Sequence, residues 1–266
     1  MNIDLPQLQQ LLTMTVQQEL MPLFNAVKRR YKADGSVVTI ADQLLQQKLG
    51  DLLTGFYPGT VMLGEEMSVE QQQQLMQTDS PLWVLDPIDG TSNFATGMPF
   101  FSVSLALIQH GQVSHGLVYD PVLDECFTAS AGEGAWCNGQ PLQAEISGLG
   151  LSQSLALIDF KRLPANLAAR LIKEKPYGSQ RSLGSIALEL CWLAAGRAHL
   201  YLHAQQHLWD YAAAQLIVKE AGAFACTLNN EPVFRFDLTP RSTCAAVDEN
   251  LFAAWRDYLR VPRCDD

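Results

Sequence analysis

Residues 83–94 read Trp-Val-Leu-Asp-Pro-Ile-Asp-Gly-Thr-Ser-Asn-Phe, so an apolar strand leads into two carboxylates three positions apart. Pro87 stands between them, and the turn is rigid because proline fixes its own backbone and restricts the residue before it. Hard cations such as Mg²⁺ prefer carboxylate and carbonyl oxygens as ligands. Asp86 and Asp89 on such a turn could hold two ions close together. Gly90-Thr91 could then open a helix whose free N–H groups face a phosphate.

An Asp-Pro-x-Asp-Gly segment taken alone is as well explained by an ordinary turn. Two other acidic elements strengthen the metal interpretation: Gly64-Glu65-Glu66 follows a short apolar strand, and Trp209-Asp210 begins a predicted helix. An acid in a first helical turn usually serves only the helix dipole, so Asp210 by itself would not indicate a ligand. Together with Asp86 and Asp89, these elements predict one acidic site. The sequence shows no cysteine or serine nucleophile constellation, which favours chemistry by metal-activated water.

The rest of the chain predicts helices and strands that alternate irregularly around a central β-meander. Helical spacing of apolar residues from Leu5 to Val27 predicts a first helix that ends near Lys28. Further helices are expected over residues 40–53, 186–195, 209–221 and 249–259. Strands are expected over 60–63, 82–85, 155–158, 198–202 and 243–247, with the meander over 101–129 and a hairpin turn at 138–139. This pattern favours a layered α+β fold over a simple doubly wound sheet.

The composition is that of a large globular domain. The 266 residues are 48% hydrophobic, and we expect one domain over 1–266 with subdomains of about 1–145 and 146–266. The net charge of -10 disfavours general nucleic-acid binding but still allows a small anionic substrate beside a bound metal. The sequence shows neither a signal peptide nor an apolar run long enough to span a membrane, and its six cysteines form no C-x-x-C pair. These features predict a cytoplasmic protein with reduced thiols.

The acidic motifs resemble those of the inositol monophosphatase family. That family belongs to a lithium-sensitive, magnesium-dependent phosphatase superfamily with the fructose bisphosphatases and the bisphosphate nucleotidases. The resemblance covers nearly the whole chain, and its other matching segments are Lys32 with residues 38–42, residues 120–139, residues 181–185 and residues 220–222. It implies a layered α-β-α-β-α sandwich of the inositol monophosphatase and fructose bisphosphatase type. It also implies hydrolysis of a small phosphate monoester, foremost inositol 1-phosphate or a related sugar phosphate.

The resemblance also implies a set of metal ligands. Glu65, Asp86 and the Ile88 carbonyl would bind one Mg²⁺ ion, and Asp86, Asp89 and Asp210 would bind a second. A third, weaker ion would rely on Glu65, and Mn²⁺ could substitute for Mg²⁺. Asp86 would be shared by two ions and therefore be essential for catalysis.

The remaining implied roles concern the water, the phosphate and the substrate. Thr91 and Glu65 would orient and deprotonate the attacking water, while the Gly90 and Thr91 N–H groups would hold the phosphate. Behind the ligands the resemblance places Asp42, Glu66 and Lys32, and facing the substrate it places Asp89, Ser185, His203 and Asp210. It also implies a homodimer that is inhibited by lithium.

Two departures from the family pattern leave the substrate open. His203 stands where inositol-specific members have a glutamate, and a neutral imidazole cannot offer the two acceptors of a carboxylate. Lys161 and Arg162 stand where the family has small polar residues. They are either solvated or read a second anionic group, in which case the substrate is a bisphosphate. The alternatives are therefore a 3′(2′),5′-bisphosphate nucleotidase, a histidinol-phosphate phosphatase or, in another class, a regulatory protein that binds transcription machinery.

A zinc site is a further alternative. His199, His203 and His207 would share one face of a helix. The strand pattern over 198–202 argues against that helix, and structural zinc sites need closed ligand sets.

Overall fold

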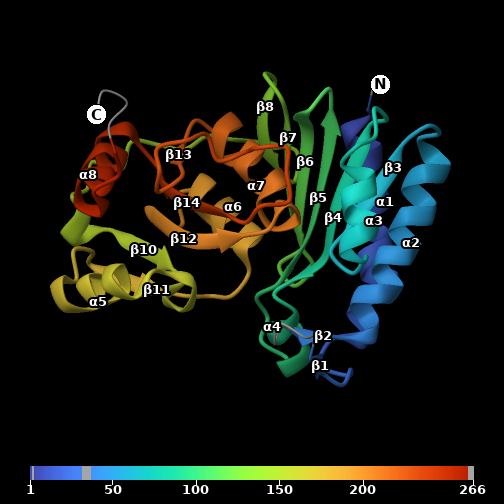
Figure 1. Ribbon diagram of the computed structural model, residues 1–266, viewed down its shortest axis with the longest axis horizontal. Coiled ribbons are helices and arrows are strands. Elements are labelled where there is room, and N and C mark those ends of the chain that lie inside the picture. Colours follow the sequence, from blue (N-terminus) through green and yellow to red (C-terminus); the bar gives the residue numbers. More distant parts are fainter. Residues whose placement is uncertain (2, 32–36, 263–266) are drawn as a thin grey trace.

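The computed structural model describes residues 1, 3–31 and 37–262. Its described residues form two large mixed sheets with helices between and outside them (Figure 1). The larger sheet has the order β3 (Val61–Gly64), β4 (Leu82–Asp89), β5 (Ser102–Gln109), β6 (Gln112–Asp120), β7 (Glu125–Ser130), β8 (Gly134–Cys137), β9 (Gln140–Leu142). The smaller has the order β11 (Ser179–Arg181), β10 (Leu155–Ile158), β12 (Leu200–Gln206), β14 (Arg241–Ala246), β13 (Phe224–Cys226).

The helices complete a five-layer sandwich. The outer layer beside the larger sheet holds α1 (Leu5–Thr15) and α2 (Ile40–Phe56), and the layer between the sheets holds α6 (Ile186–Ala194) and α7 (Leu208–Glu220). Beyond the smaller sheet lie α5 (Ala165–Glu174) and α8 (Glu249–Leu259) (Figure 1). The short elements are α3 (Val69–Leu75), α4 (Thr91–Thr96), β1 (Arg30–Tyr31) and β2 (Val37–Val38). The predicted α-β-α-β-α arrangement is confirmed.

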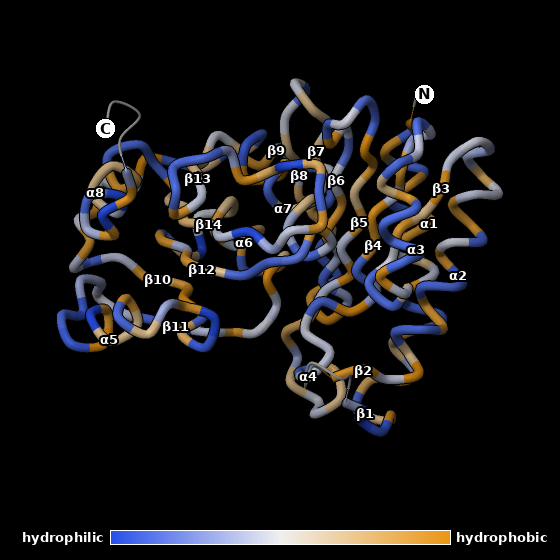
Figure 2. Tube along the Cα trace, in the orientation of Figure 1, coloured by the Kyte–Doolittle hydropathy of each residue, from blue (hydrophilic) through white to orange (hydrophobic). Residues whose placement is uncertain are grey.

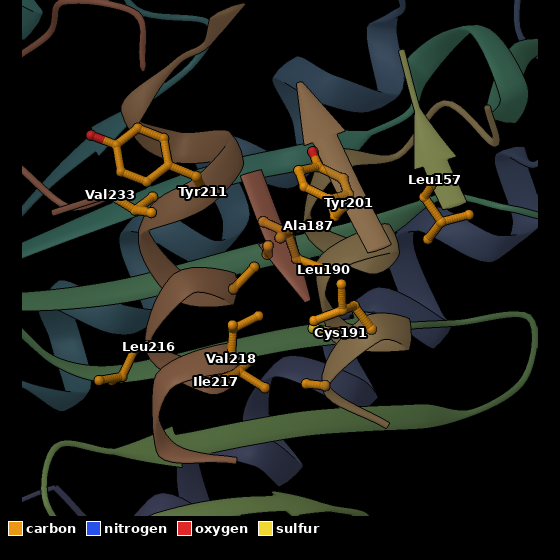
Figure 3. Close-up of a cluster of buried hydrophobic side chains, with 14 of the residues drawn as sticks. Leu157, Ala187, Leu190, Cys191, Tyr201, Tyr211, Leu216, Ile217, Val218 and Val233 are labelled. Atoms are coloured by element: carbon orange, nitrogen blue, oxygen red, sulfur yellow. The ribbon is translucent and has the colours of Figure 1, made fainter. Parts of the chain in front are cut away.

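Strand β4 is hydrophobic on both faces because helices cover both. Trp83 and Leu85 point into the core beneath α1 and α2, whereas Leu82 and Val84 point into the core shared with α6 and α7. Successive strand residues alternate between faces, so this double burial requires an unbroken apolar run. Figure 2 shows β4 and β5 as largely hydrophobic strands, and Figure 3 shows part of the cluster between α6, α7 and β12.

The predicted end of the first helix is wrong. The α-helix stops at Thr15 and continues as one π-helical segment (Val16–Leu20) and one 3₁₀ turn (Met21–Leu23). Pro22 explains the change, because it has no N–H to donate and its ring clashes with the carbonyl four residues earlier. Phe24 leaves the helical conformation, with ψ at 128°.

Most other predicted elements are present with shifted ends. The strand at 155–158 and the helix at 249–259 match fully, and the hairpin turn at Asn138-Gly139 joins β8 to β9. The strand predicted over 82–85 is too short, since it extends through Asp89. The strand predicted over 198–202 instead runs from Leu200 to Gln206, so the three histidines do not share a helix.

The helices and the cysteines of the described residues bear on membrane spanning and on disulfide bonding. In the described part of the chain, no helix combines the length and apolar character needed to cross a membrane. The described cysteines are free thiols, namely Cys126, Cys137, Cys191, Cys226 and Cys244, while Cys264 lies outside the described residues.

Glycine at position 116 allows α7 to approach the larger sheet. A Cβ atom on Gly116 would lie 2.7 Å from the Ala213 carbonyl oxygen and 3.0 Å from the Ala213 Cα. Both contacts are with backbone, so Gly116→Ala is expected to destabilise the fold by about 2–3 kcal/mol through overpacking. Urea denaturation would measure this. The control is Gly55→Ala in α2, where a Cβ meets nothing within 4 Å. Equal unfolding midpoints for the two variants would contradict the prediction.

Candidate active site

A bulge in β4 places two aspartates on the same side of the larger sheet. Asp86 pairs with Ser104 and Asp89 with Ser102, so Pro87 and Ile88 together face one residue of β5. In a regular strand, residues three apart point to opposite faces, and the extra residue of the bulge corrects this. The bulge also accommodates Pro87, which cannot donate to the ladder. Asp86 and Asp89 therefore both face the layer of α6 and α7.

Glu65 reaches the same region through parallel strand pairing. β3 pairs with β4 in parallel, with Gly64 opposite Leu85, so the next residues, Glu65 and Asp86, lie side by side at the carboxyl ends of two strands. The Glu65 N–H donates to the Leu85 carbonyl at 3.2 Å. The Gln72 side chain of α3 donates to the Gly64 and Glu65 carbonyls and fixes the turn. Ligand sites commonly form at such strand ends.

Asp89 caps helix α6. Its carboxylate accepts from Ser185 Oγ at 2.6 Å, from the Ala187 N–H at 2.6 Å and from the Ile186 N–H at 3.0 Å. Burial raises the pKa of Asp89 to about 6, against these hydrogen bonds and with repulsion from Glu65. A residue of β4 is thereby attached to a helix almost 100 positions later in the chain.

Asp210 enters the site from the first turn of α7. Its Oδ2 accepts the His207 N–H at 2.7 Å, and the strand beneath is joined to the helix by a bond from Ser104 Oγ to the Trp209 carbonyl. Burial raises the pKa of Asp210 well above its usual range, and repulsion from Asp89 and Glu65 raises it further. Asp210 therefore faces the same carboxylates as the β4 aspartates.

Asp42 supports the turn from the N-terminus of α2. Its Oδ2 accepts the Thr39 N–H and Oγ1, each at 2.7 Å, and its Oδ1 lies 3.1 Å from Thr91 Oγ1. The Thr91 hydroxyl also lies 3.0 Å from the Ile88 carbonyl, so its proton points to one of these two acceptors. Burial raises the pKa of Asp42, with a smaller contribution from Glu65. Asp42 and the Ile88 carbonyl thus hold the Thr91 hydroxyl between them.

Asp86 is the centre of the acidic cluster. Burial raises its pKa well above the usual range, and repulsion from Glu65, Asp89, Asp210 and Asp42 adds to this. Several carboxylates in one buried region need either protons or a cation. All of the side-chain donors are oxygens, which suits Mg²⁺ better than zinc.

The cluster is not arranged as a completed coordination sphere. Among the described residues, no three His, Cys, Asp or Glu side chains are already placed together as metal ligands. Asp89 and Asp210 direct oxygens to the N–H groups at the starts of α6 and α7, which offset the mutual repulsion. A cation in the centre would compete with these hydrogen bonds for the same oxygens. The donor set therefore fits a hard cation by its chemistry, because all of its side-chain donors are carboxylate oxygens.

The structure places the other predicted residues as follows. Gly90 adopts φ of 99°, which favours glycine, and its Cβ would lie 3.0 Å from the Gly184 carbonyl. Glu66 lies beside Glu65 in the turn after β3, with its N–H bonded to the Gln46 side chain at 2.9 Å. His203 is buried on β12 near the start of α7. Lys32 lies outside the described residues.

Two residues in this region escaped the sequence analysis. Glu189 of α6 accepts the Leu183 and Gly184 N–H groups, and burial raises its pKa to about 7. Asn93 of α4 donates to the Phe100 and Leu183 carbonyls, each at 2.7 Å. An acid inside the apolar stretch 186–195 was a signal that could have identified Glu189.

Known proteins share this sequence pattern and fold. The model of the inositol monophosphatase family matches residues 6–259. Inositol monophosphatase 1 of Bos taurus is 34% identical over 222 residues, covering 81% of this chain and 78% of that protein. Nus factor SuhB of Pasteurella multocida is 36% identical over 203 residues, covering 74% of each.

Solved structures of inositol monophosphatases have the same fold as this chain. The inositol monophosphate-bound structure of SaIMPase-II has a TM-score of 0.77 at 27% identity, covering 97% of this chain and 94% of that one. The 2′AMP-bound structure of SaIMPase-II has a TM-score of 0.80 at 28% identity, covering 96% and 94%. The chain therefore belongs to the inositol monophosphatase family and is a phosphoric monoester hydrolase.

Proposed function

We propose that the protein hydrolyses a small phosphate monoester, foremost inositol 1-phosphate or a related sugar phosphate, in a Mg²⁺-dependent reaction with water. The observation that carries the proposal is the acidic cluster around Asp86, whose pKa is raised by burial and further by repulsion from Glu65, Asp89 and Asp210. Three buried carboxylates beside the half-buried Glu65 are unfavourable unless a cation neutralises them. A phosphate group also requires that neutralisation before it can approach.

The proposed ligand assignment is the one that the family resemblance implies. Glu65, Asp86 and the Ile88 carbonyl would hold one Mg²⁺, and Asp86, Asp89 and Asp210 would hold another. Bound Mg²⁺ supplies charge neutralisation and lowers the pKa of a water molecule that it binds. A third ion near Glu65 and replacement by Mn²⁺ are parts of the same proposal.

Thr91 and Glu65 would handle the attacking water. The Thr91 hydroxyl donates a hydrogen bond to Asp42 or to the Ile88 carbonyl, so its oxygen can accept a hydrogen bond from that water. Glu65, at the end of β3 beside Asp86, would accept the proton that the water loses. In this proposal Asp42 and the Ile88 carbonyl hold Thr91, and Thr91 orients the water.

The phosphate would lie against the turn between β4 and α4. Gly90 allows the turn to pass close to the Gly184 carbonyl, and the Gly90 and Thr91 N–H groups would donate to phosphate oxygens. Asp89, Ser185 and Asp210 at the starts of α6 and α7 would then face the remainder of the substrate. The 2′AMP and inositol monophosphate bound by SaIMPase-II support a site that accepts more than one alcohol group.

The direct test is a panel of phosphate monoesters assayed with Mg²⁺ and with excess chelator. We expect turnover of inositol 1-phosphate in Mg²⁺ and a loss of at least about 100-fold in chelator, because the carboxylates alone repel the substrate. Turnover that is unchanged by chelator would overturn the proposal. Inclusion of a 3′,5′-bisphosphate nucleotide and histidinol phosphate separates the two alternative phosphatase activities.

A regulatory role is a second candidate. The observation that favours it is 36% identity to Nus factor SuhB of Pasteurella multocida. Absence of turnover on every phosphate in the panel, combined with co-purification of transcription proteins, would favour this role. Lithium inhibition, a homodimer and a cytoplasmic location are further proposals from the resemblance, which inhibitor titration, light scattering and cell fractionation would test.

A further inference from the structure

Asp159 and His203 are brought together at one end of the smaller sheet. β10 and β12 are parallel, with Ile158 opposite Leu202, so the next residue of each strand lies beside the other. The Asp159 N–H donates to the Leu202 carbonyl at 3.2 Å. His203 Nε2 lies 3.2 Å from Asp159 Oδ2. The pair is a consequence of strand register, and neither residue is near the other in sequence.

The hydrogen bonds of His203 define its tautomer. Its Nδ1 accepts the Gln205 N–H at 3.3 Å, so Nδ1 is the nitrogen without a proton. The proton of the neutral ring is therefore on Nε2, which donates to Asp159. Both nitrogens are used within the protein, and the His203 side chain is only 3% exposed. His203 thus positions a neighbour and does not itself contact a substrate.

Asp159 is the accessible member of the pair. Its side chain is 27% exposed, and its Oδ1 accepts the Lys161 N–H at 2.9 Å. Burial opposes ionisation, but hydrogen bonds from His203 and Lys161 hold the pKa of Asp159 below its usual value. Each carboxylate oxygen has two lone-pair directions, so acceptor capacity remains on the exposed side.

Asp159 also lies at the edge of the smaller sheet from which the active site is built. β10 is parallel to β11 and to β12, so the carboxyl ends of the three strands meet at one edge. β12 leads from this edge into the first turn of α7, which holds Asp210. The segment after β11 leads to Ser185, whose hydroxyl donates to Asp89. Asp159, directly after β10, therefore lies at the same edge as the residues that lead into the acidic cluster.

We propose that Asp159, held in place by His203, determines substrate specificity. Its carboxylate accepts a hydrogen bond from a hydroxyl group on the alcohol part of the phosphate monoester. This inference rests on the proposed phosphatase function and narrows its substrate class to phosphate monoesters of polyols. A carboxylate accepts hydroxyl donors and repels a second phosphate. The acceptor therefore comes from the end of β10, and His203 on β12 serves as its support.

The test compares Asp159→Ala with wild type on two substrates. Inositol 1-phosphate offers hydroxyls, and 4-nitrophenyl phosphate offers none. We expect kcat/KM for inositol 1-phosphate to fall about 10- to 100-fold, mainly through KM, because an ionised acceptor is lost. Hydrolysis of 4-nitrophenyl phosphate should stay within about twofold. Equal losses on both substrates, or no loss on either, would overturn the inference.

Variants of His203 test its positioning role. His203→Ala should reproduce the selective loss seen in Asp159→Ala, and His203→Gln should recover part of it because its amide can donate to Asp159. Arg162→Ala tests the alternative in which Arg162 binds a second phosphate group of a bisphosphate substrate. A wild-type preference for fructose 1,6-bisphosphate that Arg162→Ala removes would overturn the polyol assignment in favour of a second anionic group.

Calorimetry separates this inference from the proposed function. Binding of inositol 1-phosphate to the wild type and to Asp159→Ala is measured with Ca²⁺ in place of Mg²⁺, independently of turnover. If the wild type hydrolyses none of the substrates, the proposed function fails. Weaker binding by Asp159→Ala would still support the Asp159 subsite, whereas equal or absent binding would overturn it.

Discussion

Replacing Asp86 with asparagine is expected to lower kcat/KM on a phosphate monoester by at least about 1,000-fold. Asp86 lies in the second half of β4, and burial raises its pKa well above the usual range, with further contributions from the neighbouring acids. In the proposed ligand assignment it is the side chain that serves both ions. Asparagine keeps the shape but removes the charge, so the loss reports on metal binding and not on packing. A steady-state assay across Mg²⁺ concentrations measures it.

The matched control is Asp120→Asn. Asp120 is another buried aspartate of the larger sheet, where its Oδ1 accepts the Val122 and Leu123 N–H groups. The substitution Asp120→Asn makes the same chemical change away from the cluster, and the activity of this variant should stay within about threefold of wild type. Near wild-type turnover of Asp86→Asn, or an equal loss in Asp120→Asn, would defeat the assignment of Asp86 as the shared ligand.

Without divalent cations, the protein is expected to become more stable as the pH falls from about 8 to about 5. Burial raises the pKa of Asp89 to about 6 and that of Glu189 to about 7. Between the unfolded and the folded pKa values, the native state binds more protons than the unfolded state. Unfolding free energy therefore decreases as pH rises through this window. Each shift corresponds to roughly 3 kcal/mol at pH 8.

Mg²⁺ should remove the part of this pH dependence that comes from Asp89 by taking the place of its proton, whereas the part that comes from Glu189, which is not a proposed ligand, should remain. Differential scanning calorimetry at pH 5 to 8, in chelator and in Mg²⁺, would give the two Tm curves. The effect should reverse below about pH 4, since Asp237 and Asp248 have lowered pKa values and lose their contribution on protonation. A chelated protein whose Tm rises from pH 5 to pH 8 would show that the cluster is not strained by its own charge.

Much of the architecture could be predicted because local patterns determine it. The double-sided apolar run before Asp86 predicts a buried strand, and glycines after 195 and 221 predict the ends of two helices. α6 ends at Ala194 and α7 at Glu220, each with one capping alanine between the helix and Gly196 or Gly222. The first helix was predicted too long because the apolar periodicity continues past Pro22, where the backbone cannot follow it.

Other features depend on contacts that a single sequence does not display. The helix α5 and the strand β13 were missed, since α5 buries only Leu171 fully and β13 is three residues long. The β4 bulge was not predicted, although Pro87 was its signal. The Asp159–His203 pair follows from the register of β10 and β12, which no local pattern contains. Sequence reasoning identified His203 as unusual but could not show its partner.

The bond between Asp89 and α6 has an evolutionary consequence. Asp89 precedes the irregular segment 143–150, whereas its hydrogen-bond donors at Ser185, Ile186 and Ala187 follow it. Recombination within that segment would therefore split a proposed metal ligand from the helix that orients it. A chimera of two distant homologues joined there would inherit both parts yet lose their fit. In distant homologues, Asp89 and the residues at the start of α6 should therefore change together.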